Sequence, residues 1–361
     1  MIQVTRKKGN KNMISFRRWI IISTFSLCLI GLLGLTLQLT SYKSVSHARL
    51  IEDTQLLLNQ YKFHGSVLVV KDQQVIYEES FGNANRKQQI PNTPNTRYYI
   101  ASLTKSMLST AIYQLQEQHK LHVSDSVSRY IPAFKDQPSL TILHLLSHTS
   151  GLDQHNETTG PVSADDLITE IHSMKPVDYP GHTFRYSDSN YSLLAAIIDL
   201  VSGMPYEMYV RTHIFEPANM KTAGFTKDLP SFPDGSTGYT NPKSLQTPLY
   251  IDMSELRGSG DVYATIKDIY QFDRALSNGT LLSSSSLSQM LTKQSSLYAS
   301  GWFLGKDTFY HTGSIPGWTS GNFVSLDHST LVILLSNQNL RVDDITHIGF
   351  TIMKETQRYK K

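Results

Sequence analysis

The spacing of hydrophobic positions changes along the chain and predicts two kinds of element. Apolar side chains three or four residues apart predict helices, because such positions share one helix face. Alternating or short apolar runs between turn residues predict strands. The predicted helices cover residues 48–61, 102–119, 140–148, 189–203, 206–215, 265–276 and 344–355. The predicted strands cover residues 65–70, 74–82, 298–305, 308–313, 321–327 and 329–337.

The order of these elements predicts an α+β fold. Two strands come first, many helices follow, and several strands and one helix end the chain. We therefore expect an antiparallel sheet that takes strands from both chain ends, with flanking helices and a mostly helical insert over about residues 120–290. Residues 227–260 are rich in Pro, Gly, Ser and Thr and are expected to form a long loop, which often borders a functional site.

An uncharged apolar run precedes this body. As a helix, residues 19–39 would span about 31 Å, enough to cross a bilayer. Six basic and no acidic residues come before it, which predicts that residues 1–18 stay in the cytoplasm. The sequence thus predicts a cytoplasmic tail, a transmembrane anchor, a tether over 40–48 and an extracytoplasmic domain over 49–356. A signal peptide cleaved near residues 44–48 is the alternative.

Charge and cysteine content narrow the classes of function. Of the 33 basic residues, six lie in the first 18 positions, which leaves 27 against 30 acidic residues in the rest of the chain. The sequence pI of about 8.7 therefore comes from the tail, and we expect no nucleic-acid partner. The one cysteine, Cys28, lies in the predicted anchor, so the exported part has neither a disulfide nor a thiol nucleophile.

A serine and a lysine lie three positions apart in residues 98–115, a stretch that opens like a strand and becomes a helix at Ser102. Ser102 and Lys105 share a helix face, so the hydroxyl and the amine can approach each other. A buried lysine with a lowered pKa can take the proton that a serine must lose to become a strong nucleophile. Backbone N–H groups at this junction can hold an oxyanion. The alternative is a serine cap beside a surface lysine.

Tyr186 and Asp188 stand directly before the predicted helix over 189–203. A phenol relays a proton when a nearby cation holds down its pKa, which makes Tyr186 a candidate proton carrier. The alternative is that Tyr186 is a half-buried aromatic residue and that Asp188 caps the helix.

His311, Thr312 and Gly313 lie on a predicted strand near the end of the chain. The glycine leaves room for a substrate backbone, and an edge strand offers N–H groups to a peptide-like ligand. His311 is a candidate second cation that would keep Lys105 from protonating. The alternative is a strand histidine and a turn glycine without a functional role.

Other motifs argue against metal and cofactor chemistry. His144 and His148 have a spacing that suits a metal, but Leu145 stands where the zinc-protease helix motif has glutamate, so we interpret them as packing residues. The sequence has no G-x-S-x-G elbow, Walker-type loop or dinucleotide fingerprint. We therefore predict that the protein uses no metal and no organic cofactor.

The order of the three motifs resembles one known superfamily. Ser102-x-x-Lys105, Tyr186-Ser-Asp188 and His311-Thr-Gly313 are similar to the motifs of the serine β-lactamases and penicillin-binding proteins. The likeness runs from about residue 65 to about residue 337 and is strongest to the class C-like branch, with its D-alanyl-D-alanine carboxypeptidases and related esterases. The resemblance implies a β-lactamase/transpeptidase-like fold.

The resemblance also implies a role for each residue. Ser102 would be acylated, Lys105 would accept its proton, and Tyr186 would pass a proton to the leaving group and help to activate water. The pocket would be lined by Asp188, His311, Thr312, Gly313 and Ser314. The N–H groups of Ser102 and Ser314 would form the oxyanion hole.

Two positions depart from the superfamily's usual motifs. Asp188 stands where the second motif usually has asparagine, and an anion there would either strengthen Lys105 as a cation or select a cationic substrate. His311 stands where many β-lactamases have lysine, and a neutral histidine is a weak anchor for an antibiotic's carboxylate. Both departures favour the carboxypeptidase and esterase members over the β-lactamases.

The sequence therefore predicts a bacterial, membrane-anchored serine hydrolase with an extracytoplasmic catalytic domain. Its expected substrates are D-alanyl esters or amides of the cell envelope, in peptidoglycan stem peptides or teichoic acid. Two alternatives stay open: a β-lactamase proper, and a wall-binding or sensory relative that keeps the fold without turnover.

Overall fold

The computed structural model describes residues 46–156, 160–226, 235–241, 245–248, 252–295 and 297–359. The predicted cytoplasmic tail, the anchor and most of the tether lie outside the described residues. Several parts of the predicted loop over 227–260 also lie outside them.

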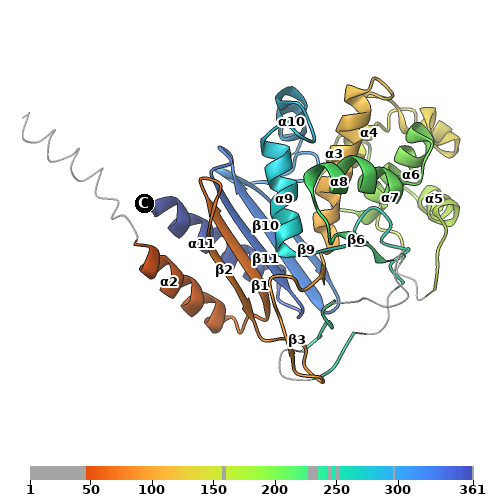
Figure 1. Cartoon of the computed structure of the whole chain (residues 1–361). Helices are drawn as coiled ribbons and strands as arrows, with labels where there is room; N and C mark the ends of the chain where they lie inside the picture. The colour runs from red at the N-terminus through yellow and green to blue at the C-terminus, as the bar shows by residue number, and fades with distance from the viewer. Residues whose placement is uncertain are drawn as a thin grey trace, which may run out of the picture.

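The centre of the domain is a six-stranded antiparallel sheet built from both ends of the described chain (Figure 1). Its spatial order is β2-β1-β11-β10-β9-β8. The bounds are β1 Gly65–Lys71, β2 Gln74–Phe81, β8 Phe303–Leu304, β9 Thr308–Ile315, β10 Trp318–Ser325 and β11 Thr330–Ser336. The register pairs Gly65 with Ser336, so the first strand of the sheet lies beside the last. The predicted antiparallel sheet with strands from both ends is confirmed.

Alternate residues of each strand face two separate cores, as the two-residue period of a strand requires. Val67 and Val69 of β1 join a core beneath helices α2 (His47–Gln60) and α11 (Val342–Arg358). Leu68 and Val70 face the opposite way, into the larger core of the helical region. Both faces are buried, which explains why β1 and β11 read as continuous apolar runs.

The helical region lies on the second face of the sheet, to the right in Figure 1. The α-helices are α3 Thr104–Glu117, α4 Ile142–Leu146, α5 Ala164–Ser173, α6 Asp188–Ser202, α7 Tyr206–Val210, α8 Glu216–Ala218, α9 Ile266–Ser277 and α10 Ser284–Met290. Short helical turns are η1 Ala101–Leu103, η2 Val127–Arg129, η3 Pro132–Asp136 and η4 Arg211–Phe215, the last a π-helical turn. Helix α3 is almost wholly buried, residues 189–198 of α6 are buried, and the two helices pack on each other at the centre of this region.

Two small sheets complete the described fold. Strands β5 (Tyr98–Tyr99), β7 (Val262–Ala264) and β6 (Gly224–Phe225) form a three-stranded sheet in the order β5-β7-β6. Strands β3 (Asn83–Asn85) and β4 (Ile90–Pro91) form a hairpin below the main sheet in Figure 1. The β5–β7 pairing matters for the site, because it fixes the chain directly before η1.

Three helices, α5, the three-residue α8 and α10, were not predicted from the sequence. Helix α5 begins with a capping box between Ser163 and Asp166. This pattern is visible in the sequence and indicates the start of a helix. Helix α10 consists largely of serine, and Ser283 caps it by accepting a hydrogen bond from the N–H of Ser286. Serine-rich sequence has little intrinsic helix preference, so capping and packing decide this element.

No single helix among the described residues is long and apolar enough to cross a membrane. Together, Asp188–Ser202 and Tyr206–Ala218 have the necessary length and composition, although they are bent by 80° at their junction. Both contribute buried side chains to the larger core.

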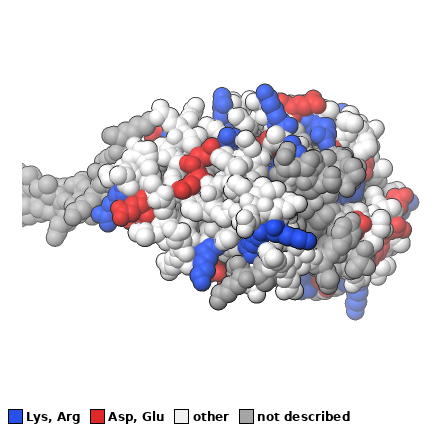
Figure 2. Space-filling view, turned by 60° about the horizontal axis from the view of Figure 1, so that its bottom comes forward, with Lys and Arg blue, Asp and Glu red and all other residues white. Residues whose placement is uncertain are grey.

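Charged side chains are dispersed on the face of the molecule shown in Figure 2. Basic and acidic residues alternate there with larger uncharged areas, and the described residues of that face form no continuous basic patch. This distribution agrees with the near balance of charge that the sequence shows after its basic tail.

Candidate active site

Ser102 lies in a short helical turn that the neighbouring strand holds in place. The N–H of Ile100 donates to the carbonyl of Val262 at 3.1 Å, and the next residue, Ala101, has a φ of +49°. A positive φ at alanine is strained, and such strain is common at functional sites. Ala101 and Leu103 are buried while Ser102 is partly exposed, so the turn presents its hydroxyl outward.

Lys105 is completely buried one turn further on and contacts three oxygen atoms. Its Nζ lies 3.0 Å from Ser102 Oγ, 2.5 Å from Asp188 Oδ1 and 2.8 Å from the carbonyl oxygen of Ser259. Helix α3 has no side-chain cap at its start. The alternative of a serine cap and a surface lysine is therefore wrong.

These three partners fix the direction of the lysine's lone pair. A neutral amine has two N–H groups and one lone pair. The Asp188 carboxylate and the Ser259 carbonyl can only accept, so they take the two N–H groups. The lone pair of neutral Lys105 then faces the side of Ser102 Oγ and the Tyr186 hydroxyl, the partners that have a proton to give.

Electrostatics nevertheless hold a proton on Lys105 in the resting protein. Burial alone would lower the pKa of Lys105, but the charge of Asp188, helped by Tyr186, raises it above its ordinary value. The expectation that burial would bring this pKa toward neutrality is wrong. The raised pKa agrees with the first expectation for Asp188, namely that an anion at this position would strengthen Lys105 as a cation.

Tyr186 reaches the same point from the turn before α6. Its hydroxyl interacts with both Lys105 and Ser102, and its ring stacks on His148 with centroids 4.2 Å apart. The residue as a whole is 36% exposed, although its hydroxyl contacts Lys105 and Ser102. Burial raises the pKa of Tyr186 in spite of Lys105, so the expectation of a lowered pKa is wrong. A neutral phenol can donate a proton.

Asp188 is the first residue of α6 and turns its carboxylate into the site. The cap position, Ser187, makes no side-chain capping bond. Gln154 clamps Asp188 from outside, because Gln154 Nε2 donates to Oδ2 at 3.3 Å and the N–H of Asp188 donates to Gln154 Oε1 at 2.7 Å. Asp188 is thus more than a helix cap, and its side chain remains 23% exposed.

His311 lies on β9 with both ring nitrogens occupied. Nδ1 lies 2.7 Å from the carbonyl oxygen of Thr312, which can only accept, so the proton belongs on Nδ1. Nε2 then accepts from the hydroxyl of Tyr298 at 2.9 Å. Burial, together with the charge of Lys105, lowers the pKa of His311 to about 3. The imidazole is neutral, so the expectation of a second cation is wrong.

The rest of the third motif lies against the nucleophile's backbone. A Cβ on Gly313 would stand 2.9 Å from the nitrogen of Ser102 and 2.5 Å from the carbonyl oxygen of Ile100, so only glycine allows this approach. Thr312 is buried and Ser314 is exposed beside the turn. Strand β8 pairs with β9 only at Phe309 and Tyr310, so it leaves this end of the strand without a partner on that side.

His144 and His148 have separate structural duties. His144 forms a capping box with Thr141 at the start of α4. His148 Nδ1 accepts from the N–H of Ser187 at 3.2 Å and from Asn190 Nδ2 at 3.0 Å, which ties it to the Tyr186 turn. No group of three or more possible metal ligands occurs within the described ranges.

Four partners in this site carried no sequence signal that we recognised. Gln154 and Ser259 lie in loops, Tyr298 lies between α10 and β8, and His148 was considered only with His144. Their contacts are long-range and arise from the fold.

The chain belongs to a known family. A family model described as beta-lactamase matches residues 54–350. Among curated proteins, the chain is 40% identical over 303 residues to "Putative penicillin-binding protein PbpX" of Bacillus subtilis (strain 168), which covers 82% of this chain and 77% of that protein. It is 26% identical over 305 residues to a teichoic acid D-alanine hydrolase of Staphylococcus aureus (strain MRSA252), which covers 82% and 76%.

A solved structure gives the same result. A penicillin-binding protein from Bacillus halodurans matches with a TM-score of 0.72 and 26% identity, covering 81% of this chain and 97% of that chain. The protein is therefore a member of the beta-lactamase family of serine hydrolases, with the α+β fold of that family.

Proposed function

We propose that this chain is a membrane-anchored, extracytoplasmic serine hydrolase that forms an acyl-enzyme on Ser102. The observation that carries the proposal is the 3.0 Å contact between Ser102 Oγ and the buried Nζ of Lys105, with the Tyr186 hydroxyl interacting with both. A nucleophile within reach of a base, with a third group beside them, is the usual arrangement for covalent catalysis.

Acylation uses the neutral fraction of Lys105. Ser102 Oγ attacks the substrate carbonyl carbon as its proton passes to Lys105 Nζ. The N–H groups of Ser102 and Ser314 hold the oxyanion, and losing one such donor typically costs about 2.7–4 kcal/mol. As the bond to the leaving group breaks, Tyr186 gives its proton to the departing atom and takes one from the Lys105 ammonium.

Deacylation reverses the proton path. A water molecule adds to the ester carbonyl and gives a proton to Lys105, with Tyr186 assisting. The bond between the carbonyl carbon and Ser102 Oγ then breaks, and Oγ recovers a proton. The acid is released and the site returns to its resting form.

The charges in the site favour D-alanyl esters among the cell-envelope substrates. A D-alanyl ester carries a free ammonium group, and Asp188 Oδ2 lies on the exposed side of the Lys105–Asp188 pair. A stem peptide ending in D-alanine brings a carboxylate instead, and His311 is neutral and unable to pair with it. The likeness to a teichoic acid D-alanine hydrolase supports the same choice.

The predicted anchor over residues 19–39 sets the location in this proposal. It holds the catalytic domain on the outer side of the membrane, next to the envelope polymers that carry D-alanyl groups. Immunodetection of the chain in membrane fractions, with its domain accessible to external protease in protoplasts, is the expected result; a cytosolic chain would contradict it.

Release of free D-alanine tests the substrate. Purified wild-type protein and Ser102→Ala are each incubated with D-alanylated teichoic acid and, separately, with wall peptide fragments. We expect release from teichoic acid by the wild type alone. Release by Ser102→Ala at the wild-type rate would overturn the role of Ser102, and release from peptide fragments alone would overturn the ester preference.

The Lys105–Asp188 pair also favours a second candidate, a wall-binding relative without turnover. A lysine held as a cation is a poor base, so acylation or release could be arrested. One equivalent of product in a burst, with no steady-state release, is the result expected for this candidate. Nitrocefin hydrolysis at enzyme-like rates would instead establish a β-lactamase.

A further inference from the structure

The Ser259 carbonyl that accepts from Lys105 belongs to a tightly wedged backbone segment, residues 256–261. Gly258 has a φ of +77°, and a Cβ there would stand 2.8 Å from Leu108 Cδ2 of α3 and 2.7 Å from Ala195 Cβ of α6. The N–H groups of Ser259 and Gly260 both donate to the carbonyl of Leu256 at 2.8 Å. The segment therefore lies between the two central helices, and its conformation decides where the Ser259 carbonyl points.

A buried carboxyl and a buried phenol tie this segment to α7. The N–H of Gly258 donates to Asp261 Oδ1 and lies equally close to the Tyr206 hydroxyl, at 3.2 Å in each case. The Tyr206 hydroxyl donates in turn to Asp261 Oδ2. Tyr206 is completely buried and Asp261 is 6% exposed, so water does not compete for these bonds.

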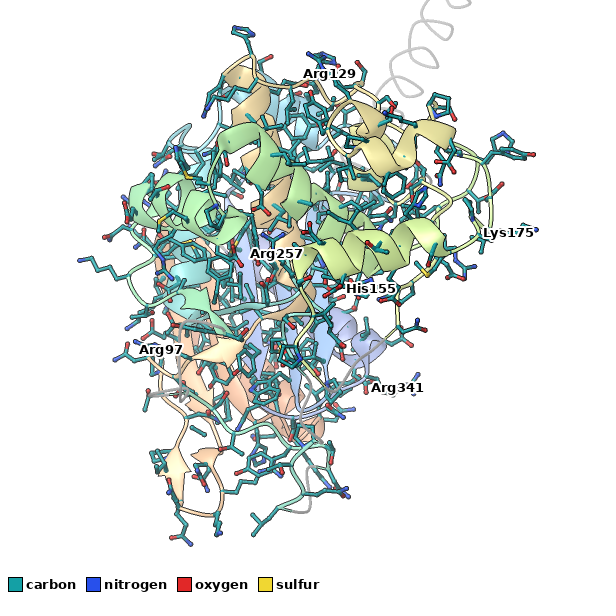
Figure 3. All side chains as sticks on the ribbon, turned by 90° about the vertical axis from the view of Figure 1, so that its right-hand side faces the viewer. Arg97, Arg129, His155, Lys175, Arg257 and Arg341 are labelled. Carbon is teal, nitrogen blue, oxygen red and sulfur yellow. The ribbon has the colours of Figure 1, made fainter. Side chains whose placement is uncertain are left out.

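An arginine adds a second attachment from the same segment. Arg257 Nη2 lies 2.7 Å from Asp199 Oδ2 of α6 and 3.7 Å from Glu207 Oε2 of α7. The Arg257 guanidinium also stacks over the Tyr206 ring, with its central carbon 4.6 Å from the ring centroid. Figure 3 shows Arg257 near the middle of the molecule, whereas Lys175 lies at its edge.

We propose that Tyr206 and Asp261 are positioning residues that aim the Ser259 carbonyl at Lys105 and so orient its lone pair toward Ser102. Neither residue is proposed to contact substrate; they act through the backbone of residues 258–260. The inference rests on the proposed function, because it concerns the base that activates Ser102.

The pH dependence of acylation reports this role. The groups that face Lys105 are the Asp188 carboxylate, the Tyr186 phenol and, more distantly, the Tyr191 ring and the neutral imidazoles of His148 and His311. An ammonium has three N–H groups and is best satisfied by three acceptors. Displacing the Ser259 carbonyl removes one acceptor, which lowers the pKa of Lys105 and leaves its lone pair poorly aimed.

Asp261, which accepts from Tyr206, can itself gain or lose a proton near neutral pH, and this determines which variants are informative. Burial raises the pKa of Asp261 to about 7; Glu207 adds to this effect, and the hydrogen bond from Tyr206 and the charge of Arg257 oppose it. Asp261→Asn imitates the protonated carboxyl and is the milder change. Tyr206→Phe removes the hydroxyl but keeps the ring beneath Arg257, so it is the more direct probe.

The experiment measures the rate at which a fluorophosphonate labels Ser102 at pH values from 6 to 10 or so, using the full chain. Labelling needs one activated attack and no turnover, so it isolates the base. For Tyr206→Phe we expect the rate at high pH to fall by about tenfold or more, because a small displacement of a catalytic group is costly. We also expect the rise with pH to begin about one pH unit lower. Asp261→Asn should show the same change to a smaller extent.

Asp273→Asn serves as the matched control, because it changes another buried carboxyl at the far end of the sheet. Melting temperatures are measured for every variant. We expect the control to keep the wild-type pH profile whatever its melting temperature.

The outcomes distinguish the positioning role from the proposed function. Tyr206→Phe and Asp261→Asn profiles that superpose on the wild type, with or without lower melting temperatures, would overturn the positioning role. An equal shift in Asp273→Asn would overturn it too. A wild-type chain that is not labelled at Ser102 at any pH would overturn the proposed function, and this inference with it.

Discussion

Two carboxyl groups in the helical region, Asp188 and Asp273, meet very different partners. Asp188 Oδ1 lies 2.5 Å from the Lys105 ammonium, and the side chain is 23% exposed. Asp273 of α9 is 3% exposed, and its Oδ1 accepts from Asn322 Nδ2 at 2.9 Å. Burial raises the pKa of Asp273 to about 8, so this group is mainly neutral at pH 7.

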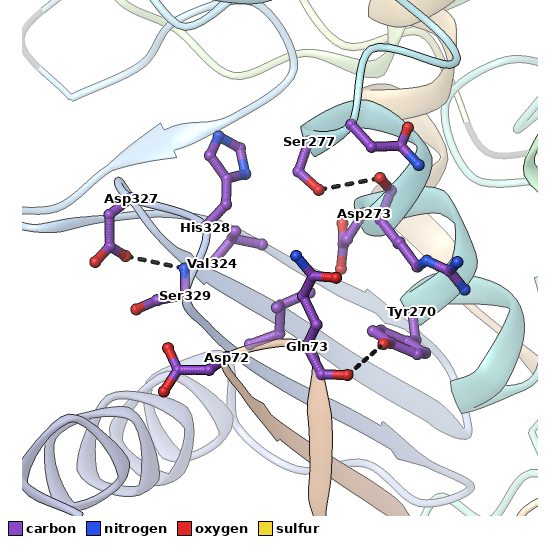
Figure 4. A pocket seen from close by; sticks show the side chains of 12 residues that line it. Asp72, Gln73, Tyr270, Asp273, Ser277, Val324, Asp327, His328 and Ser329 are labelled. Carbon is purple, nitrogen blue, oxygen red and sulfur yellow. Dashed lines mark hydrogen bonds between the residues drawn. The ribbon is translucent and has the colours of Figure 1, made fainter. Parts of the chain in front are cut away.

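The surroundings of Asp273 resemble a binding site at first sight. The residue borders a cavity of about 560 Å³ between α9 and the turns at residues 72–73 and 327–329 (Figure 4). The sheet register puts these turns at the opposite end from Gly313 and Ser314. Within the described residues, Asp273 Oδ2 and Asn322 Oδ1 have no hydrogen-bond partner. A proton on Asp273 would satisfy both oxygens by closing an acid–amide pair.

The comparison teaches that burial and a shifted pKa do not by themselves mark an active site. Asp188 pairs with the cation of Lys105, and that cation contacts a partly exposed nucleophile. Asp273 gains a proton because its partner is a neutral amide. Convergence of a nucleophile, a base and a proton donor distinguishes the first region, and variants of each member test this distinction.

Removing the cation should have the largest effect. In Lys105→Met, Ser102 loses its base, and we expect acylation to fall by about 10³-fold or more. Asp188 loses its counter-ion, and we expect about 1–3 kcal/mol of stability to be lost, because a partly buried carboxylate is left without its charged partner. Labelling kinetics and denaturant unfolding measure the two effects.

A double variant separates these two consequences. Lys105→Met with Asp188→Asn should recover most of the lost stability while acylation stays abolished. Recovery of activity would show that Lys105 is dispensable as a base, and unchanged stability would show that the ion pair is unimportant.

A variant of Tyr186 tests whether catalysis beside Lys105 and Asp188 also needs a neutral proton donor. Tyr186→Phe keeps the ring that stacks on His148 and removes only the hydroxyl. We expect kcat to fall by about 10²-fold or more, since a positioned proton donor typically contributes that much. Steady-state hydrolysis of an ester measures it, and a wild-type kcat would exclude Tyr186 from proton transfer.

Asp188→Asn should make the surroundings of Lys105 resemble the uncharged surroundings of Asp273. The pKa of Lys105 is raised by Asp188, so the wild-type rate should still be increasing on the alkaline side of neutrality. Without the carboxylate, burial dominates, and we expect the rise to begin about 1–3 pH units lower. The KM for a D-alanyl ester should increase, while the KM for an ester without an ammonium group should not. Identical pH profiles would contradict the assigned ion pair.

Asp273→Asn should have the smallest effect and only on stability. The unfolded chain releases the Asp273 proton near the ordinary pKa of 3.8, but the folded chain keeps it up to about pH 8. The wild type therefore loses stability as pH rises through this window, and the variant does not. We expect the variant to be more stable than the wild type at pH 8, with no difference near pH 4. Thermal melts at both pH values measure this.

Local pattern was enough to predict most of the fold. The spacing of hydrophobic residues within a single segment is enough to predict its type. This holds for the amphipathic helix at residues 48–61, the hairpin at 65–82 and the final antiparallel strands. Helix α5 was missed although its buried residues Leu167 and Ile171 have helical spacing, and α10 was missed because it is short and consists largely of serine.

The site was predictable in its motifs and unpredictable in its electrostatics. The order of the motifs identified Ser102, Lys105, Tyr186 and His311, which the structure brings together. The protonation of Lys105 and His311 depends on partners distant in sequence, such as Ser259 and Tyr298. Such contacts exist only once the chain has folded, so residue type and spacing cannot reveal them.

The central claim is that Ser102 is the residue that becomes acylated. The most direct measurement is peptide mass mapping of the full chain after reaction with a fluorescent penicillin or a fluorophosphonate, beside Ser102→Ala. The account predicts one adduct, on the peptide that contains Ser102, and no adduct in the variant. Labelling that survives in Ser102→Ala, or an adduct mapped to another residue, would contradict it.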